Sequence, residues 1–187
     1  MVKAVLFDMV GPLLMKCPDF VGDPVVDVAE TIWKETKDVH KMVEGLRNDV
    51  TTKNLTTAEV ASHVVRKFCK IPEVWEFILP RLFGRYKLAV VNNGMGITVP
   101  LFKETFNFKD YFELFINSSE EGVEKPNPGI FKITYQRLGV TPSECVFTDD
   151  SELNVKGAED VGMKGIIYKD PQSFKEQLEL LLNTEYC

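Results

Sequence analysis

The feature that most constrains the fold is a regular alternation of strand-like and helix-like segments after residue 84. The strand-like runs are short, apolar and rich in β-prone residues, and they occupy residues 86–91, 114–116, 145–148 and 165–168. Helical patterns lie between and after them, at 97–105, 128–138, 152–161 and 172–182. A further buried strand is expected at 2–7. Strands that alternate with helices at this spacing predict an α/β fold with a parallel sheet and helices on both faces.

Residues 17–83 interrupt this alternation, because they show helical spacing and no strand signal. Apolar residues recur at helical spacing between 25 and 46, and Thr56 with Glu59 forms the capping-box pattern that begins a helix. Another helical stretch follows Pro72. The expected division is therefore a core of residues 1–16 and 84–187 and a small all-α cap of residues 17–83, inserted after the first strand.

The composition is that of an ordinary globular protein, with 187 residues and a formal net charge of −6. Lys and Arg are scattered, whereas binding to a phosphate backbone or an anionic lipid surface needs them clustered, so we expect neither nucleic acid nor a membrane as a partner. No segment approaches the roughly 20 apolar residues of a membrane-spanning helix. The four cysteines follow no metal-binding spacing, and we therefore expect free thiols in a reducing, cytoplasmic environment.

Polar side chains follow the carboxyl ends of three of the predicted strands. Asp8 follows the first strand, Asn92 and Asn93 follow the second, and Asp149 and Asp150 follow the fourth. Ligands of open parallel sheets bind outside the carboxyl ends of the strands, so these residues are candidates for one site. Lys125, just before an expected helix, joins them.

Three carboxylates in one crevice repel one another unless positive charge lies between them. A divalent cation and one lysine supply that charge, and Mg²⁺ prefers a few carboxylates, water and phosphate oxygens as ligands. An aspartate beside such an ion, with lysine and amide donors opposite, can attack a phosphoryl group. The sequence therefore predicts a magnesium site at Asp8, Asp149 and Asp150 that performs phosphoryl chemistry.

Four ordered segments resemble the motifs of the haloacid dehalogenase superfamily of hydrolases. They comprise residues 7–11, 90–94, 124–131 and 146–154. The resemblance implies a Rossmann-like core with a helical cap inserted between the first and second motifs. It also implies that Asp8 is the nucleophile and a metal ligand, and that Lys125 neutralises the charge of the nucleophile and the phosphate.

The same resemblance implies the remaining roles. Asp150 would hold Mg²⁺, Asp149 would contribute directly or through water, and the backbone carbonyl of Val10 would be a further ligand. Asn92 and Asn93, with nearby backbone amides, would hold the transferring phosphoryl group. The implied activity is Mg²⁺-dependent hydrolysis of a small phosphorylated metabolite through an aspartyl-phosphate on Asp8.

Position 10 departs from the pattern of the family. Its phosphatases usually carry a second aspartate there, which protonates the leaving oxygen and later activates water, but this chain has Val10. A positioned acid or base contributes about 10²–10⁴ in rate, so the expected enzyme is slow. One alternative is a degenerate member that binds a phosphorylated ligand or a protein without turnover. Another is a metal-independent 2-haloacid dehalogenase, which the acidic pair Asp149–Asp150 disfavours.

Overall fold

The computed structural model describes residues 1–182, and they form two compact units. The sheet unit comprises Met1–Met15, Lys70–Asn93 and the chain from residue 109 onward. The helical unit comprises Lys16–Cys69 and Gly94–Phe108. None of the helices within residues 1–182 is long and apolar enough to cross a membrane.

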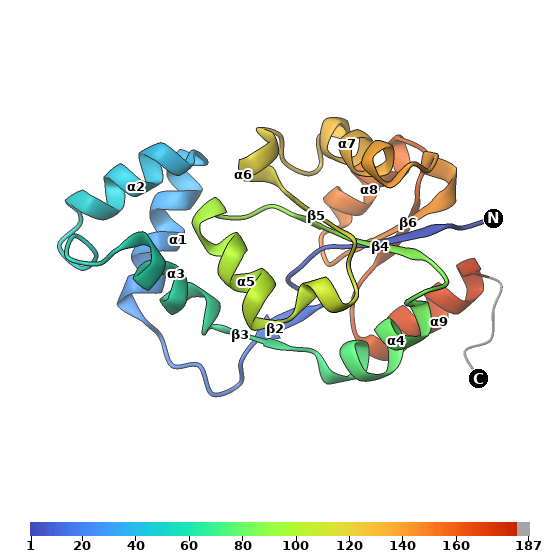
Figure 1. Cartoon of the computed structure of the whole chain (residues 1–187), viewed down its shortest axis with the longest axis horizontal. Helices are drawn as coiled ribbons and strands as arrows, with labels where there is room; N and C mark the ends of the chain where they lie inside the picture. The colour runs from blue at the N-terminus through green and yellow to red at the C-terminus, as the bar shows by residue number, and fades with distance from the viewer. Residues whose placement is uncertain (183–187) are drawn as a thin grey trace. The chain divides into compact units, whose positions relative to one another are not determined.

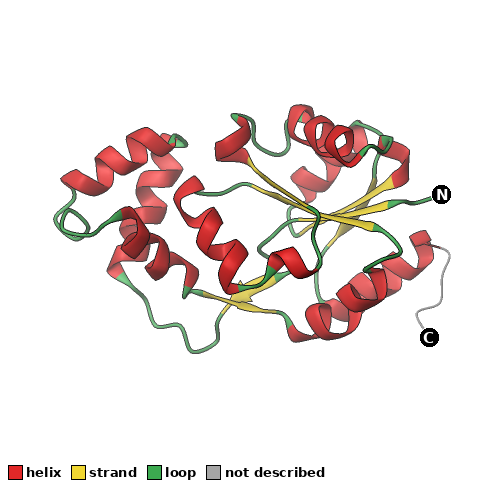
Figure 2. Ribbon diagram, in the orientation of Figure 1, coloured by secondary structure: helices red, strands yellow, loops and turns green. Residues whose placement is uncertain are grey.

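The sheet unit is built on five parallel strands in the spatial order β5-β4-β1-β6-β7, and it confirms the predicted α/β fold (Figure 2). The strands are β1 (Ala4–Phe7), β4 (Lys87–Asn92), β5 (Leu114–Asn117), β6 (Cys145–Asp149) and β7 (Lys164–Ile167). All four residues of β1 are fully buried, because this strand pairs with β4 on one side and β6 on the other. A strand buried on both faces gives a continuous apolar run in the sequence, as predicted.

Helices cover both faces of this sheet. One face carries α7 (Pro128–Leu138) and α8 (Glu152–Asp160), while α4 (Leu79–Leu82) and α9 (Pro171–Leu182) lie on the other (Figure 1). A π-helical turn, Val74–Ile78, leads into α4, and the remaining short helical elements are α6 (Ser118–Glu121) and the 3₁₀ turns Pro142–Glu144 and Phe108–Asp110. Asn127 and Ser151 cap the first turns of α7 and α8, so both helices begin where polar capping residues occur in the sequence.

The helical unit contains α1 (Pro24–Thr36), α2 (Val39–Asn48), α3 (Thr57–Val65), a 3₁₀ turn (Gly96–Thr98) and α5 (Val99–Thr105). Its core gathers Trp33, Met42 and Val60 from the first three helices. The predicted capping box of α3 is confirmed: the Thr56 side chain accepts from the Glu59 amide, and the Glu59 carboxylate accepts from the Thr56 amide. This local signal suffices because both residues lie within one helical turn.

The two units divide the chain differently from the sequence-based boundaries. Residues 94–108 belong to the helical unit, where Met95 and Ile97 pack with the apolar cluster of α1, α2 and α3. Residues 70–83 belong to the sheet unit, where the Trp75 indole donates a buried hydrogen bond to the Leu13 carbonyl. Apolar spacing identifies a helix but not the surface against which it packs, so the sequence could not assign these segments.

Two further expectations were wrong. A second sheet pairs β2 (Leu14–Lys16) with β3 (Phe68–Lys70), although no strand was expected within 17–83. Three-residue strands are too short to show an alternating pattern. Cys17 and Cys69 form a disulfide, with Cα atoms 5.2 Å apart, although free thiols were expected. They meet because β2 pairs with β3, which cysteine spacing alone does not reveal. Cys145 is a buried free thiol, and Cys187 lies outside the described residues.

Reduction of the Cys17–Cys69 disulfide is expected to lower the free energy of unfolding by about 4 kcal/mol, because a bond across 52 residues removes much loop-closure entropy from the unfolded chain. Urea unfolding with and without a reductant measures this loss. The double variant Cys17→Ser/Cys69→Ser is the control, and its midpoint should not respond to the reductant. Equal midpoints for the native chain under both conditions would contradict the prediction.

Candidate active site

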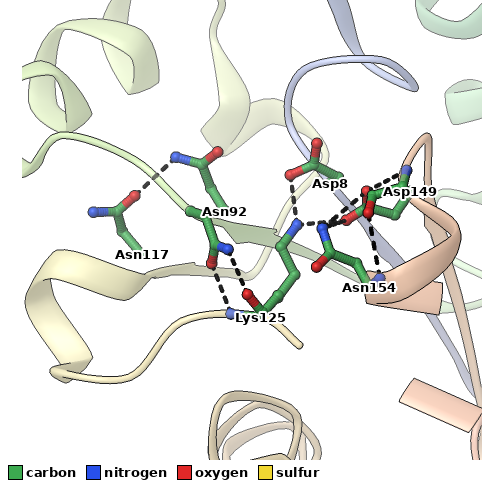
Figure 3. Close-up of polar contacts among 8 residues, drawn as sticks. Asp8, Asn92, Asn117, Lys125, Asp149 and Asn154 are labelled. Atoms are coloured by element: carbon green, nitrogen blue, oxygen red, sulfur yellow. Dashed lines mark hydrogen bonds and ion pairs between the residues drawn. The ribbon is translucent and has the colours of Figure 1, made fainter. Parts of the chain in front are cut away.

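Lys125 is the centre of a polar cluster at the carboxyl edge of the sheet (Figure 3). Its Nζ donates to Asp8 Oδ1 at 2.6 Å and to Asp149 Oδ2 at 2.7 Å, and its side chain is only 1% exposed. The ammonium also lies 5.3 Å from the centre of the Phe147 ring. Residues that are 117 and 24 positions from Lys125 in the sequence are thus held by one buried cation. Asp8, which follows β1, and Asp149, which ends β6, thus contact the same lysine.

Asp149 uses both of its oxygens within the protein. Oδ1 accepts from the Ser151 amide at 2.9 Å and from Asn154 Nδ2 at 3.2 Å, while Oδ2 accepts from Lys125 Nζ and from Asn154 Nδ2 at 3.1 Å. Three donor nitrogens make four contacts with this carboxylate, so it has little capacity left for a cation. Its geometry therefore favours holding Lys125, with any contribution to a metal made through water.

Asp8 and Asp150 retain more capacity for a cation. Their carboxylate oxygens and that of Asp149 lie within 4.8 Å of one another. Burial raises the pKa of Asp8 to about 6, even though the Lys125 ammonium lowers it. Burial, followed by the Asp149 charge, also raises the pKa of Asp150. Three carboxylates against one ammonium leave excess negative charge, and this all-oxygen donor set fits a hard divalent cation such as Mg²⁺.

The turn after β1 brings the first motif against Asp150. Gly11 has φ +109°, and a Cβ at this position would lie 3.1 Å from the Cβ and Cγ of Asp150. The turn is closed by hydrogen bonds from the Gly11 amide to the Leu14 carbonyl and from the Leu14 amide to the Met9 carbonyl. Glycine is thus required here both for its backbone conformation and for the close approach. The same turn carries Val10, whose backbone carbonyl is the further ligand implied by the resemblance.

Asn92 is the last residue of β4 and is almost fully buried, with 6% exposure. Its Nδ2 donates to Asn117 Oδ1 at 2.8 Å, and Asn117 in turn donates to the Ser119 hydroxyl. An amide nitrogen carries two donors, so Asn92 retains one N–H for a ligand. Asn117 holds the amide of Asn92 in one orientation.

Asn93 makes different contacts from its neighbour. Its side-chain amide is bound to the backbone of Lys125, accepting from the Lys125 amide at 2.8 Å and donating to the Lys125 carbonyl at 2.9 Å. Both predicted phosphate ligands therefore lie at the edge of the sheet. Their side-chain amides form hydrogen bonds with different partners, Asn117 for Asn92 and the Lys125 backbone for Asn93.

Sequence reasoning assigned no role to two residues of this cluster, Asn117 and Asn154. Asn117 ends β5, so the rule that selects polar residues at strand ends would have found it had the strand been extended by one residue. Asn154 lies in the first turn of α8, and its contact with Asp149 depends on how that helix leaves the sheet. No signal in the sequence identifies that contact.

Comparison with known proteins gives a consistent result. The sequence profile of haloacid dehalogenase-like hydrolases matches residues 78–162, which include three of the four motif segments but not Asp8. Bifunctional epoxide hydrolase 2 of Rattus norvegicus is 37% identical over 76 residues, or 41% of this chain and 14% of that protein. A glyceraldehyde 3-phosphate phosphatase from Methanopyrus kandleri is 31% identical over 113 residues, or 58% of this chain and 48% of that protein. The matches thus span less than half the length of these curated relatives.

Solved structures share the fold. A HAD family enzyme from Bacteroides thetaiotaomicron, in complex with magnesium and inorganic phosphate, superimposes with a TM-score of 0.66 at 21% identity, covering 89% of this chain and 93% of that one. The parallel sheet with helices on both faces defines an α/β fold of the Rossmann-like class. The chain is thus similar to haloacid dehalogenase-like hydrolases in sequence over residues 78–162, and it shares the fold of a HAD family enzyme over most of its length.

Proposed function

We propose that this hydrolase is a Mg²⁺-dependent phosphatase of a small phosphorylated metabolite and works through an aspartyl-phosphate on Asp8. The observation that carries the proposal is the buried ammonium of Lys125 between Asp8 and Asp149, next to a third carboxylate on Asp150. Support comes from the relative named as a glyceraldehyde 3-phosphate phosphatase and from the similar fold that binds magnesium and inorganic phosphate.

We infer a step for each side chain. An oxygen of Asp8 attacks the phosphorus atom, forming an acyl phosphate as the bond to the leaving oxygen breaks. Lys125 donates two N–H groups to carboxylates, and its ammonium would offset the charge of the transferring group. Asp8, Asp150 and the Val10 carbonyl would hold Mg²⁺, which supplies charge neutralisation for the phosphate oxygens. Water then hydrolyses the acyl phosphate and regenerates Asp8.

Val10 makes the second half of this reaction the difficult one. A valine side chain can neither protonate the leaving oxygen nor take a proton from the attacking water. Aryl phosphates release a leaving group that needs little protonation, whereas alkyl phosphates need an acid. We therefore propose that the enzyme is slow and that hydrolysis of the aspartyl-phosphate limits its turnover.

Removal of the metal tests the proposal. The protein is expected to release the aryl group of a simple aryl phosphate when Mg²⁺ is present, to lose this activity with EDTA, and to recover it when Mg²⁺ is added in excess. The readout is the absorbance of the released phenolate. Activity that is unchanged by EDTA would contradict a role for the metal, and EDTA-insensitive activity on a 2-haloacid would point to dehalogenation.

Val10 and the neighbouring Pro12 favour a second candidate, a family member that binds a phosphorylated ligand or a protein without turnover. Family members usually have threonine where this chain has Pro12. The second candidate predicts that Mg²⁺ and inorganic phosphate bind, measured by calorimetry, while no aryl phosphate is hydrolysed. Turnover that disappears in Asp8→Asn would reject it.

A further inference from the structure

We propose that Asn93 is a positioning residue that fixes the backbone of Lys125, and that it acts on the phosphoryl group through this lysine instead of binding the group itself. The inference rests on the proposed phosphatase function for its catalytic consequence. The hydrogen bonds that carry it involve residues of the sheet unit alone.

Lys125 needs such support because of its place in the chain. It lies in the linker of residues 122–127 between α6 and α7, where no helix or strand fixes the backbone. Its side chain is nevertheless buried, and its Nζ contacts two carboxylates at the ends of two different strands. A lysine has four rotatable bonds, so the position of its ammonium depends on where the backbone that carries it is held.

Asn93 holds that backbone from the side of the sheet. It follows directly after β4, and its single side-chain amide satisfies both polar backbone groups of Lys125: Oδ1 accepts from the N–H at 2.8 Å, and Nδ2 donates to the carbonyl at 2.9 Å. The pair of bonds has the form of one rung between two strands. Since both ends of the amide are used, its orientation is set by Lys125.

Helix α8 contacts the same segment. A Cβ on Gly157 would lie 2.5 Å from the carbonyl oxygen of Pro126 and 2.8 Å from its Cβ. The helix therefore contacts Pro126 directly, and glycine at position 157 makes this contact possible. The backbone around Lys125 is thus contacted both by α8 and by the amide of Asn93.

The contact matters for catalysis because charge stabilisation requires donors that are already in place. A misplacement of about 1 Å can cost about 10²-fold in rate. We expect Asn93→Ala to lower kcat/KM by about 10- to 100-fold, because the displaced ammonium no longer stabilises the charge of the phosphoryl group. Asn93→Asp should retain part of the activity, since it keeps the acceptor for the Lys125 amide.

A double-mutant cycle with Lys125→Met separates positioning from direct binding. Methionine keeps most of the buried volume of lysine and removes the charge. Calorimetric titration with inorganic phosphate, in the presence of Mg²⁺, measures affinity in the native chain, both single variants and the double variant. Asn93→Ala should weaken phosphate binding about 10-fold when Lys125 is present and have no effect in Lys125→Met. The same loss in both backgrounds would overturn the proposal, because Asn93 would then bind phosphate itself.

Hydrogen exchange tests the contact without any need for activity. Exchange of the Lys125 amide, measured by NMR on the whole protein, should accelerate at least 10-fold in Asn93→Ala. The matched control is Asn92→Ala, since Asn92 is bound to Asn117 and should not alter this amide. Unchanged exchange in Asn93→Ala would overturn the proposal. The phosphatase function and the positioning role can fail separately. If the native chain hydrolyses no phosphate ester while Asn93→Ala still accelerates exchange of the Lys125 amide, the phosphatase function is rejected and the positioning role is kept.

Discussion

Asp8→Asn is expected to lower the turnover of an aryl phosphate by a factor on the order of 10⁴ or more. Removing a catalytic nucleophile costs this much in enzymes that form covalent intermediates, because binding and electrostatic stabilisation alone remain. The neutral amide of asparagine cannot form an acyl phosphate, and it also loses the charge that pairs with Lys125. Initial rates with saturating Mg²⁺ provide the measurement.

The same variant should be at least as stable as the native chain at pH 8. Burial raises the pKa of Asp8 to about 6, so the folded state binds a proton more tightly than the unfolded state does. The ionised carboxylate therefore costs stability above pH 6, and this cost disappears below about pH 4, where both states are protonated. Asparagine removes the cost, so urea unfolding in metal-free solution should show a gain at pH 8 and none at pH 4.

Two outcomes would contradict this account of Asp8. If Asp8→Asn retained turnover, another nucleophile would be needed. If it lost turnover together with its stability, the loss would reflect unfolding instead of chemistry. Asn154→Ala is a useful comparison, because it removes donors from Asp149 and leaves the nucleophile in place.

Val10→Asp is expected to raise the hydrolysis of an alkyl phosphate by about 10²–10⁴-fold, which is the usual contribution of a positioned acid or base. The turn that carries position 10 is already ordered by the hydrogen bonds between Gly11, Leu14 and Met9. Position 10 is also only partly buried, so a carboxylate there keeps some contact with water. The gain should be similar for an aryl phosphate, because both substrates form the same aspartyl-phosphate and its hydrolysis is the slow step.

Phosphoprotein levels provide a second readout for this variant. In the native chain, acid-quench labelling under turnover should find accumulated aspartyl-phosphate, because water is not activated. In Val10→Asp the labelled fraction should fall as turnover rises. Val10→Asn is the matched control, because asparagine has nearly the shape of aspartate but cannot act as an acid or a base. This variant should behave like the native chain. An equal gain in both variants would show that polarity, not proton transfer, limits the reaction.

The sequence by itself predicted the sheet and the residues at its carboxyl edge. Strands such as Ala4–Phe7 are buried on both faces, so their apolar runs are visible without any tertiary information. Asp8 and Asp149 could be placed together because parallel strands all end at the same edge. Helix starts at Thr56 and Asn127 depend on neighbouring residues alone, so they were equally accessible.

Only the tertiary structure decided which hydrogen bonds form at that edge of the sheet. Asn92 and Asn93 are adjacent in the sequence and identical in type, yet one amide is bound to Asn117 and the other to the backbone of Lys125. Tertiary contacts also decided that Cys17 pairs with Cys69 and that residues 94–108 belong to the helical unit. Each depends on contacts between segments far apart in the chain. The spacing of apolar residues indicates whether a segment forms a helix or a strand. It does not indicate which distant segment packs against it, and that packing decides the hydrogen-bond and disulfide partners.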